Sequence, residues 1–203
     1  MGATILTIII TAAFSSNFIL VQFLGICPFL GVSKRTGSAV SMGIAVTLVM
    51  LLATLVTYPL YQYVMKPLKI EFLEIIFFIF IIAALVQMLE KVIAKISPSL
   101  YKTMGIYLPL ITTNCAILGV AELVIGDKFY EAIGLAEAAS MNLGYALLYA
   151  LFAGVGFTLA MVLMGGVRER VEKLPVAKCL KGFPITMVVA SFMAMAFYVF
   201  TMI

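Results

Sequence analysis

Long apolar stretches separated by short polar ones dominate this chain. Asp, Glu, Lys and Arg are absent from six runs, which are residues 1–33, 36–65, 75–89, 103–121, 138–167 and 182–203. Apolar residues are continuous within these runs and do not alternate with polar ones, as they do in the strands of a membrane barrel. The pattern therefore predicts an all-α integral membrane protein with six transmembrane helices. The predicted spans are residues 3–24, 37–60, 71–90, 103–125, 140–165 and 183–203.

Composition narrows the possible chemistry. Of the 203 residues, 65% are hydrophobic and 11% are charged, against about half and a quarter in soluble domains. Six spans leave no room for a soluble enzyme domain, so residues 1–203 are expected to form a single membrane domain. The chain has no His and three Cys, which excludes a histidine base, a His-ligated metal and a disulfide framework of paired cysteines. Any chemistry of this chain must therefore use thiols, carboxylates, amides or bound cofactors.

The basic residues indicate the orientation. Loops one, three and five carry ten Lys and Arg residues, whereas loops two and four carry three. Because cytoplasmic loops are enriched in Lys and Arg, loops one, three and five are expected in the cytoplasm and both termini outside. The expected location is the cytoplasmic (inner) membrane of a bacterium or archaeon. This loop basicity accounts for the net charge of +4 without a nucleic-acid partner. Loop five, residues 165–182, is the most charged and is expected to act mainly as an anchor.

A short pattern occurs twice. Residues 17–32 (NFILVQFLGICPFLGV) align with residues 105–120 (GIYLPLITTNCAILGV), and the identities concentrate in Cys-x-x-Leu-Gly-Val. The identical pairs are Leu20 with Leu108, Cys27 with Cys115, Leu30 with Leu118, Gly31 with Gly119, and Val32 with Val120. Three helices separate the copies, and an odd number of crossings reverses direction. The halves, about 1–95 and 96–203, are therefore predicted to be inverted repeats that share a site near the midplane.

The first copy contains residues that interrupt membrane helices. Gly25, Pro28 and Gly31 flank Cys27. A proline one residue after the cysteine suits the first position of a new helical segment. We therefore expect the first transmembrane helix to be broken, with Cys27 at the N-terminus of a half-helix.

The second copy has a different interrupting sequence. Thr112, Thr113 and Asn114 precede Cys115, and Gly119 follows it. Asn or Thr at this position can cap a helix that begins at the cysteine. The fourth helix is therefore also expected to be broken. At both breaks the positive end of a helix dipole favours a thiolate.

The depth of the two thiols is predicted to be similar. The nearest charges after the motifs, Lys34 and Glu122, each lie seven residues beyond the cysteine. This is roughly 10 Å of helix, measured from opposite faces of a hydrocarbon core about 30 Å thick. Two thiolates are fewer than the four ligands of a closed iron or zinc site. Either they form half of a site completed by another chain, or they bind nothing.

The segments NFILVQFLGICPFLGVS (17–33) and YLPLITTNCAILGVA (107–121) resemble signatures of a known family. This is the family of the A subunit of the Rnf ion-translocating oxidoreductase complex, which includes the E subunit of the sodium-translocating NADH:quinone oxidoreductase. The resemblance covers essentially the whole chain. It implies that Cys27 and Cys115 ligate the iron of one intramembrane [2Fe–2S] cluster, shared with a homologous six-helix subunit of opposite orientation (the E subunit of the Rnf complex).

The resemblance also implies a function that this chain does not perform alone. The complex passes electrons between reduced ferredoxin and NAD and couples this transfer to Na⁺ or H⁺ translocation. The chain is expected to relay electrons across the bilayer, with the B, C, D and G subunits carrying further iron–sulfur clusters and flavins. No flavin is expected on this chain. Cys179 has no counterpart in the repeat and is interpreted as a spare loop thiol.

Two other functions fit some of the sequence features. A secondary transporter or channel also has inverted repeats and broken helices, but it places several polar residues at the midplane. Here only the cysteines and the Thr112–Asn114 group qualify. An assembly scaffold without a redox role is the other alternative, and it predicts that both cysteines are replaceable. Asn17, in the first span, is expected to form hydrogen bonds between helices.

Overall fold

The computed structural model describes residues 9–15, 17–33, 36–68, 71–96, 108–125, 143–171, 173 and 182–202. Every regular element in these ranges is helical. The first half contains η1 (Thr11–Ser15, π-helical), α2 (Ile26–Val32), α3 (Thr36–Leu60), η2 (Tyr61–Met65, π-helical), α4 (Lys66–Leu68), η3 (Glu71–Leu73, 3-10) and α5 (Glu74–Ile96). The second half contains α7 (Leu108–Thr112), α8 (Cys115–Ile125), α10 (Leu143–Val171) and α11 (Phe183–Met202).

Several of these helices fit a bilayer. Among the described residues, the segments Thr36–Met65, Glu74–Val92 and Leu143–Val171 are long and apolar enough to cross a membrane. Two shorter apolar helices cover Leu110–Ile125 and Phe183–Val199. The expected all-α membrane architecture is confirmed at this level.

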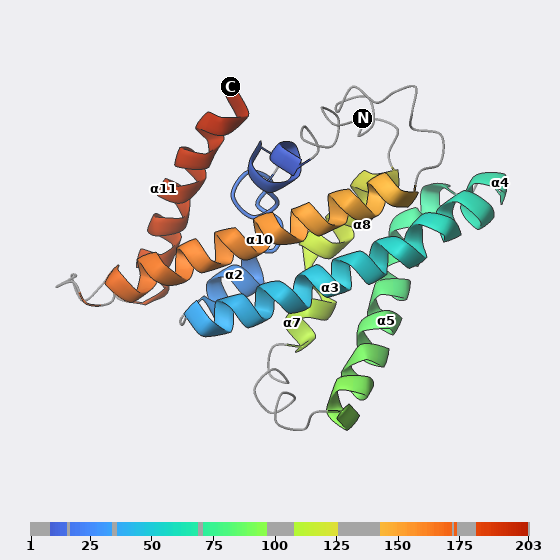
Figure 1. Cartoon of the computed structure of the whole chain (residues 1–203), viewed down its shortest axis with the longest axis horizontal. Helices are drawn as coiled ribbons and strands as arrows, with labels where there is room; N and C mark the ends of the chain where they lie inside the picture. Colours follow the sequence, from blue (N-terminus) through green and yellow to red (C-terminus); the bar gives the residue numbers. More distant parts are fainter. Residues whose placement is uncertain are drawn as a thin grey trace.

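Helices α3 and α10 form the centre of the molecule. They make the most extensive contact between any two elements and run side by side (Figure 1). A Cβ on Gly43 would lie 2.5 Å from Thr158 Oγ1, and one on Gly154 would lie 2.6 Å from Thr47 Oγ1. Each glycine of one helix therefore accommodates the threonine of the other, and small residues at such positions let membrane helices approach closely.

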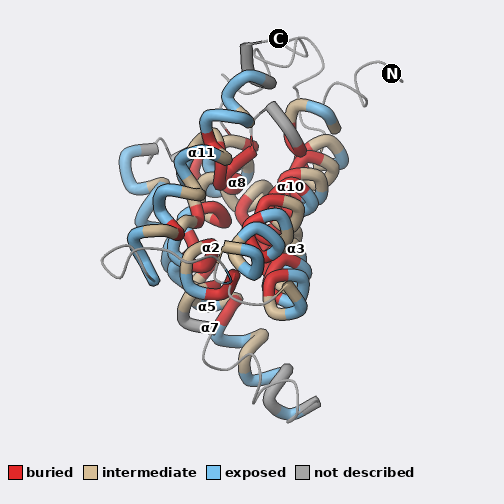
Figure 2. Tube along the Cα trace, turned by 90° about the vertical axis from the view of Figure 1, so that its left-hand side faces the viewer, coloured by how far each residue is buried: buried red, intermediate tan, exposed pale blue. Residues whose placement is uncertain are grey.

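Burial follows the inner faces of the long helices, as Figure 2 shows. Along α3 the buried residues recur at helical spacing, for example Met42, Val46, Met50 and Ala53. The outer positions are also apolar, among them Ile44 at 64% exposed. An apolar outer surface is what a lipid-facing helix presents, because lipid does not penalise exposed hydrocarbon.

The broken helices occur as predicted, but the boundaries of the first predicted span were wrong. Residues 17–25 connect η1 to α2 without a regular helix, so 3–24 is not one continuous span in the described residues. Hydropathy measures how apolar a segment is and does not show whether its backbone forms the hydrogen bonds of a helix. The fourth predicted span, 103–125, is interrupted at residues 113–114, between α7 and α8.

Two other helix ends lie beyond their predicted positions. Helix α5 continues to Ile96 instead of ending at 90, and α10 continues to Val171 instead of 165. Residues 165–171 were therefore wrongly expected to belong to loop five. Charged side chains end an apolar pattern without ending a helix, because they can bond to neighbouring elements, as Arg168 and Glu169 do here.

Candidate functional site: the paired helix breaks

The first break is organised by one buried amide. Asn17 is fully buried; its Oδ1 accepts hydrogen bonds from the backbone N–H groups of Ile19 (3.1 Å) and Leu20 (3.4 Å). Its Nδ2 donates to the carbonyl oxygens of Gly156 (2.9 Å) on α10 and Ala13 (3.3 Å). The expected interhelical bond of Asn17 is confirmed. The bonds from Ile19 and Leu20 satisfy backbone N–H groups of the irregular segment, and the bond to Gly156 ties this segment to α10.

Helix α2 begins directly after this turn. Gly25 stands at its N-cap with φ 82°, in the left-handed region that glycine adopts without steric cost. Cys27 is the second residue of α2 and is exposed, and Pro28 is the third. The proline was predicted at the first helical position. Its actual place is still within the first turn, where backbone N–H groups lack intrahelical acceptors.

The second break is capped locally. Asn114 Oδ1 accepts a hydrogen bond from the Ala116 N–H at 3.1 Å, and the Asn114 carbonyl accepts one from the Ile117 N–H at 3.1 Å. Asn114 is therefore the N-cap that the sequence predicted. Cys115 is the first residue of α8, and its side chain is exposed.

The two breaks touch each other. A Cβ on Gly25 would lie 3.0 Å from Asn114 Oδ1, 3.2 Å from Ala116 Cβ and 2.9 Å from Phe157 Cε2. The residue that precedes α2 therefore packs on the residue that precedes α8, and only a glycine fits between them. Because each cysteine lies within two residues of this contact, the fold brings the two motifs of the repeat together at the N-termini of two half-helices.

The remaining predicted supporting residues differ in their surroundings. A Cβ on Gly119 would lie 2.8 Å from Leu24 Cδ1, so this glycine permits a close approach of the first break to α8. Gly31 is exposed, and a Cβ there would meet no atom within 4 Å. Thr112 is half-buried at the end of α7, and Thr113 is exposed in the turn. Cys179 lies outside the described residues.

One polar atom at the second break has no partner. Asn114 is 4% exposed, and its Nδ2 forms no hydrogen bond. A buried donor without an acceptor costs about 1–3 kcal/mol. Among the described residues no group of three or more His, Cys, Asp and Glu is placed to hold a metal ion. In the part of the chain that the structure describes, the paired breaks therefore hold two exposed thiols and one buried amide donor without an acceptor.

Two residues that secure α2 and α3 were missed by the sequence analysis. Arg168 Nη1 donates to the carbonyl of Leu30 (2.9 Å), and Glu169 Oε1 accepts from Thr36 Oγ1 (2.7 Å). Both charges belong to the segment that was expected to be a loop. Their position directly after the apolar run of α10 is the signal that could have identified them.

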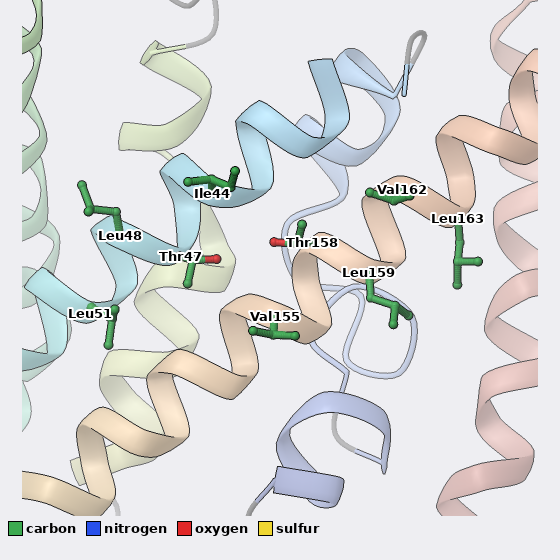
Figure 3. Close-up of a pocket in the computed structure, with 9 residues that line it drawn as sticks. All are labelled: Ile44, Thr47, Leu48, Leu51, Val155, Thr158, Leu159, Val162 and Leu163. Carbon is green, nitrogen blue, oxygen red and sulfur yellow. The ribbon is translucent and has the colours of Figure 1, made fainter. Parts of the chain in front are cut away.

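A separate groove lies between α3 and α10. Its volume is about 730 Å³ (Figure 3). Thr47 and Thr158 point toward one another across it, and its other lining residues are aliphatic: Ile44, Leu48, Leu51, Val155, Leu159, Val162 and Leu163. It contains neither cysteine and no ionisable side chain, so the paired breaks remain the candidate site.

Known proteins with similar sequences are named as subunits of ion-translocating oxidoreductase complexes. The chain is 50% identical over 198 residues, 98% of its length and 97% of the relative's, to the A subunit of the "Na(+)-translocating ferredoxin:NAD(+) oxidoreductase complex" of Acetobacterium woodii. It is 45% identical over 195 residues (95% and 94%) to the A subunit of the "Ion-translocating oxidoreductase complex" of Syntrophotalea carbinolica. The protein of the same name from Vibrio cholerae serotype O1 (strain El Tor Inaba N16961) is 43% identical over 196 residues (97% and 95%).

The family described as "Rnf-Nqr subunit, membrane protein" matches residues 5–203. The expected family resemblance is therefore confirmed over nearly the whole chain. The chain belongs to the Rnf-Nqr family of membrane-protein subunits.

Proposed function

We propose that this chain is the electron-relaying membrane subunit of an Rnf-type ion-translocating ferredoxin:NAD oxidoreductase. In this proposal Cys27 and Cys115 are two of the four thiolate ligands of an intramembrane [2Fe–2S] cluster. A homologous subunit of opposite orientation supplies the other two. The observation that carries the proposal is the contact between Gly25 and Asn114, which joins the starts of two half-helices that each present an exposed cysteine.

The residues present fit such a group. Two exposed thiols on one chain suit a site completed by a second chain, because [2Fe–2S] clusters take four protein ligands. Among the described residues, the buried Nδ2 of Asn114 has no acceptor, and a cluster sulfur would supply one. Hydrogen bonds to cluster sulfurs are among the groups that set the reduction potential.

The half-helices give the site a favourable electrostatic environment. A bound [2Fe–2S] group supplies one-electron transfer and is anionic when four thiolates ligate it. An anion in hydrocarbon is costly unless oriented dipoles oppose it. Cys27 is the second residue of α2 and Cys115 is the first residue of α8, so each cysteine lies at the positive end of a helix dipole. This chain's backbone thus stabilises negative charge at the cysteines, and the nearest described cation that an interaction ties to α2, Arg168, bonds at the opposite end of that helix.

An inverted repeat is part of the proposal. Helices α3 and α10 are the second helices of the two halves, and their Gly–Thr contacts are reciprocal: Gly43 with Thr158, and Gly154 with Thr47. In each helix the threonine hydroxyl donates to the carbonyl of its own glycine, at 2.7 Å in α3 and 2.8 Å in α10. Such reciprocity is what a two-fold axis between the halves produces. The axis would relate Cys27 to Cys115.

We place the chain in a bacterial or archaeal inner membrane with both termini outside, from the loop charges. Its partners are the E subunit, as the ligand-sharing homologue, and the B, C, D and G subunits, which carry the other iron–sulfur clusters and flavins. The coupled ion is Na⁺ or H⁺. A group held by Cys27 and Cys115 would supply one-electron chemistry, and the N-termini of α2 and α8 would respond to a change in its charge; such a response would bias the helix positions that control ion access.

The test uses the purified complex. Iron content and the electron paramagnetic resonance (EPR) spectrum of the complex are compared with those of the isolated chain. The expected result is a [2Fe–2S] signal in the complex that no other component accounts for, and no full cluster on the isolated chain. A full cluster on the isolated chain would contradict the shared site. A complex whose iron and electron transfer do not depend on the two cysteines would favour a transporter or a scaffold.

A further inference from the structure

Helix α2 is too short to hold its own position. It has seven residues, and isolated helices shorter than about 12–15 residues are marginal even for good helix formers. Its orientation therefore depends on what fixes its two ends. The N-terminal end is fixed by Gly25 against Asn114 and Phe157. The C-terminal end is fixed by α10.

Arg168 holds the C-terminal end of α2. Its Nη1 donates to the Leu30 carbonyl at 2.9 Å and approaches the Ser33 hydroxyl at 3.4 Å. Leu30 belongs to the last four residues of the helix, whose carbonyls have no intrahelical donor. Ser33 is fully buried. A guanidinium at this end also has the favourable sign for the negative end of the helix dipole.

Glu169, the next residue, holds the start of α3. Its Oε1 accepts from the Thr36 N–H at 3.2 Å and from Thr36 Oγ1 at 2.7 Å. A carboxylate has the favourable sign for the positive end of a helix dipole. A Cβ on Gly165 would lie 3.4 Å from Thr36 Cα, an ordinary van der Waals distance, so α10 passes directly beside the start of α3. Consecutive charges of opposite sign thus bind the end of one helix and the start of the next.

We propose that Arg168 and Glu169 form a clamp that fixes the corner between α2 and α3 and thereby positions the Cys27 thiol. They are positioning residues. They act on Cys27 through the backbone of α2. Cys115 lies on a different helix, α8, whose N-terminus is capped by Asn114. The consequence for the cluster rests on the proposed function, while the effect on the thiol itself does not.

The first test measures the thiol directly. The full-length chain in native membranes is labelled with a maleimide in a Cys115→Ala, Cys179→Ala background, in which Cys27 is the single thiol and lacks its paired ligand. Arg168→Gln is expected to increase the labelling rate of Cys27 about tenfold, because a tenfold change corresponds to the free energy of about one charge-assisted hydrogen bond. Arg168→Lys restores most of the wild-type rate, because it keeps the charge at the helix end.

Two matched controls separate positioning from unfolding. Arg170→Gln removes the same charge from an exposed site two residues away on α10 and is expected to leave Cys27 unchanged. In a Cys27→Ala, Cys179→Ala background, Arg168→Gln is expected to change the labelling rate of Cys115 by less than about twofold. The reason is that Asn114 caps α8 without any contribution from Arg168. Equal acceleration of both thiols, or no acceleration of Cys27, would overturn the clamp.

The second test links the clamp to the cluster. In the purified complex, Arg168→Gln is expected to shift the midpoint potential or EPR line shape of the [2Fe–2S] signal, whereas Arg170→Gln is not. If Cys27 is labelled faster but the EPR signal of the complex is unchanged, the clamp positions Cys27 only in the chain without a cluster. This result would overturn its role at the cluster. If labelling behaves as expected and the wild-type complex has no such signal, the clamp stands and the proposed function fails.

Discussion

The two helix breaks perform the same task with different means. The break before α8 is local, because Asn114 caps the helix that begins one residue later. The break before α2 is not, since Gly25 provides no side-chain cap and the turn depends on Asn17 bonding to α10. Helix α8 has 11 residues, whereas α2 has seven and needs Arg168 at its far end. The first cysteine is therefore positioned by tertiary contacts and the second mainly by sequence neighbours.

The largest effect is expected from replacing either cysteine, because each break carries one. If Cys27 and Cys115 ligate the proposed cluster, Cys27→Ala and Cys115→Ala should each abolish it together with the ferredoxin- or NADH-driven turnover of the complex, because each variant leaves an open coordination position. The fold should survive, since removing one sulfur costs on the order of 1 kcal/mol. Iron per complex and turnover measure the outcome. Cys179→Ala is the control, and equal behaviour of all three variants would reject the ligand roles.

Gly25→Ala should strongly destabilise the fold. The new Cβ would sit at φ 82° and 2.9 Å from Phe157 Cε2. Left-handed strain and overpacking together amount to about 3 kcal/mol. Thermal unfolding in detergent measures the loss. Gly31→Ala, whose Cβ would meet open space, serves as the control and is expected to be neutral or slightly stabilising. Equal melting temperatures for the two variants would show that the contact between the breaks is not tight.

Asn17→Ala should destabilise more than Asn114→Ala. The first removes bonds to four backbone groups in a fully buried site and is expected to cost about 3 kcal/mol. The second removes a single cap, worth about 1 kcal/mol. Chemical unfolding of the purified complex, or protease resistance in membranes, ranks the two. The reverse order would mean that the first break does not depend on its tertiary bonds.

The smallest expected effect isolates the unpartnered donor. Asn114→Ser keeps a capping oxygen and removes the amide Nδ2. If that nitrogen donates to a cluster sulfur, the midpoint potential should become more negative, on the order of tens of millivolts, with iron content unchanged. An EPR redox titration of the complex measures the shift. An unchanged potential would leave the Asn114 amide without a role at the site.

The helical membrane class, the family and both helix interruptions could be predicted from sequence. Continuous apolar runs, Gly25, and an asparagine placed directly before Cys115 are local signals, and each acts within a few residues. The cap by Asn114 could be predicted for this reason. Hydropathy misplaced the first span, however, because residues 17–25 are mostly apolar. They depart from a helix through the positive φ angles of Phe23 and Gly25 and through the bonds of Asn17, one of which reaches α10.

The meeting of the two motifs could not be predicted in this way and emerges from the packed helices. The fit of Gly25 against Asn114 and Phe157, and the reach of Arg168 to Leu30, join residues that are about 90 to 140 positions apart. Apolar periodicity carries no information about such pairs, since in a membrane every helix face is apolar. Close approach there is set by small residues and by a few polar bonds, and their partners are specified only when the helices have packed.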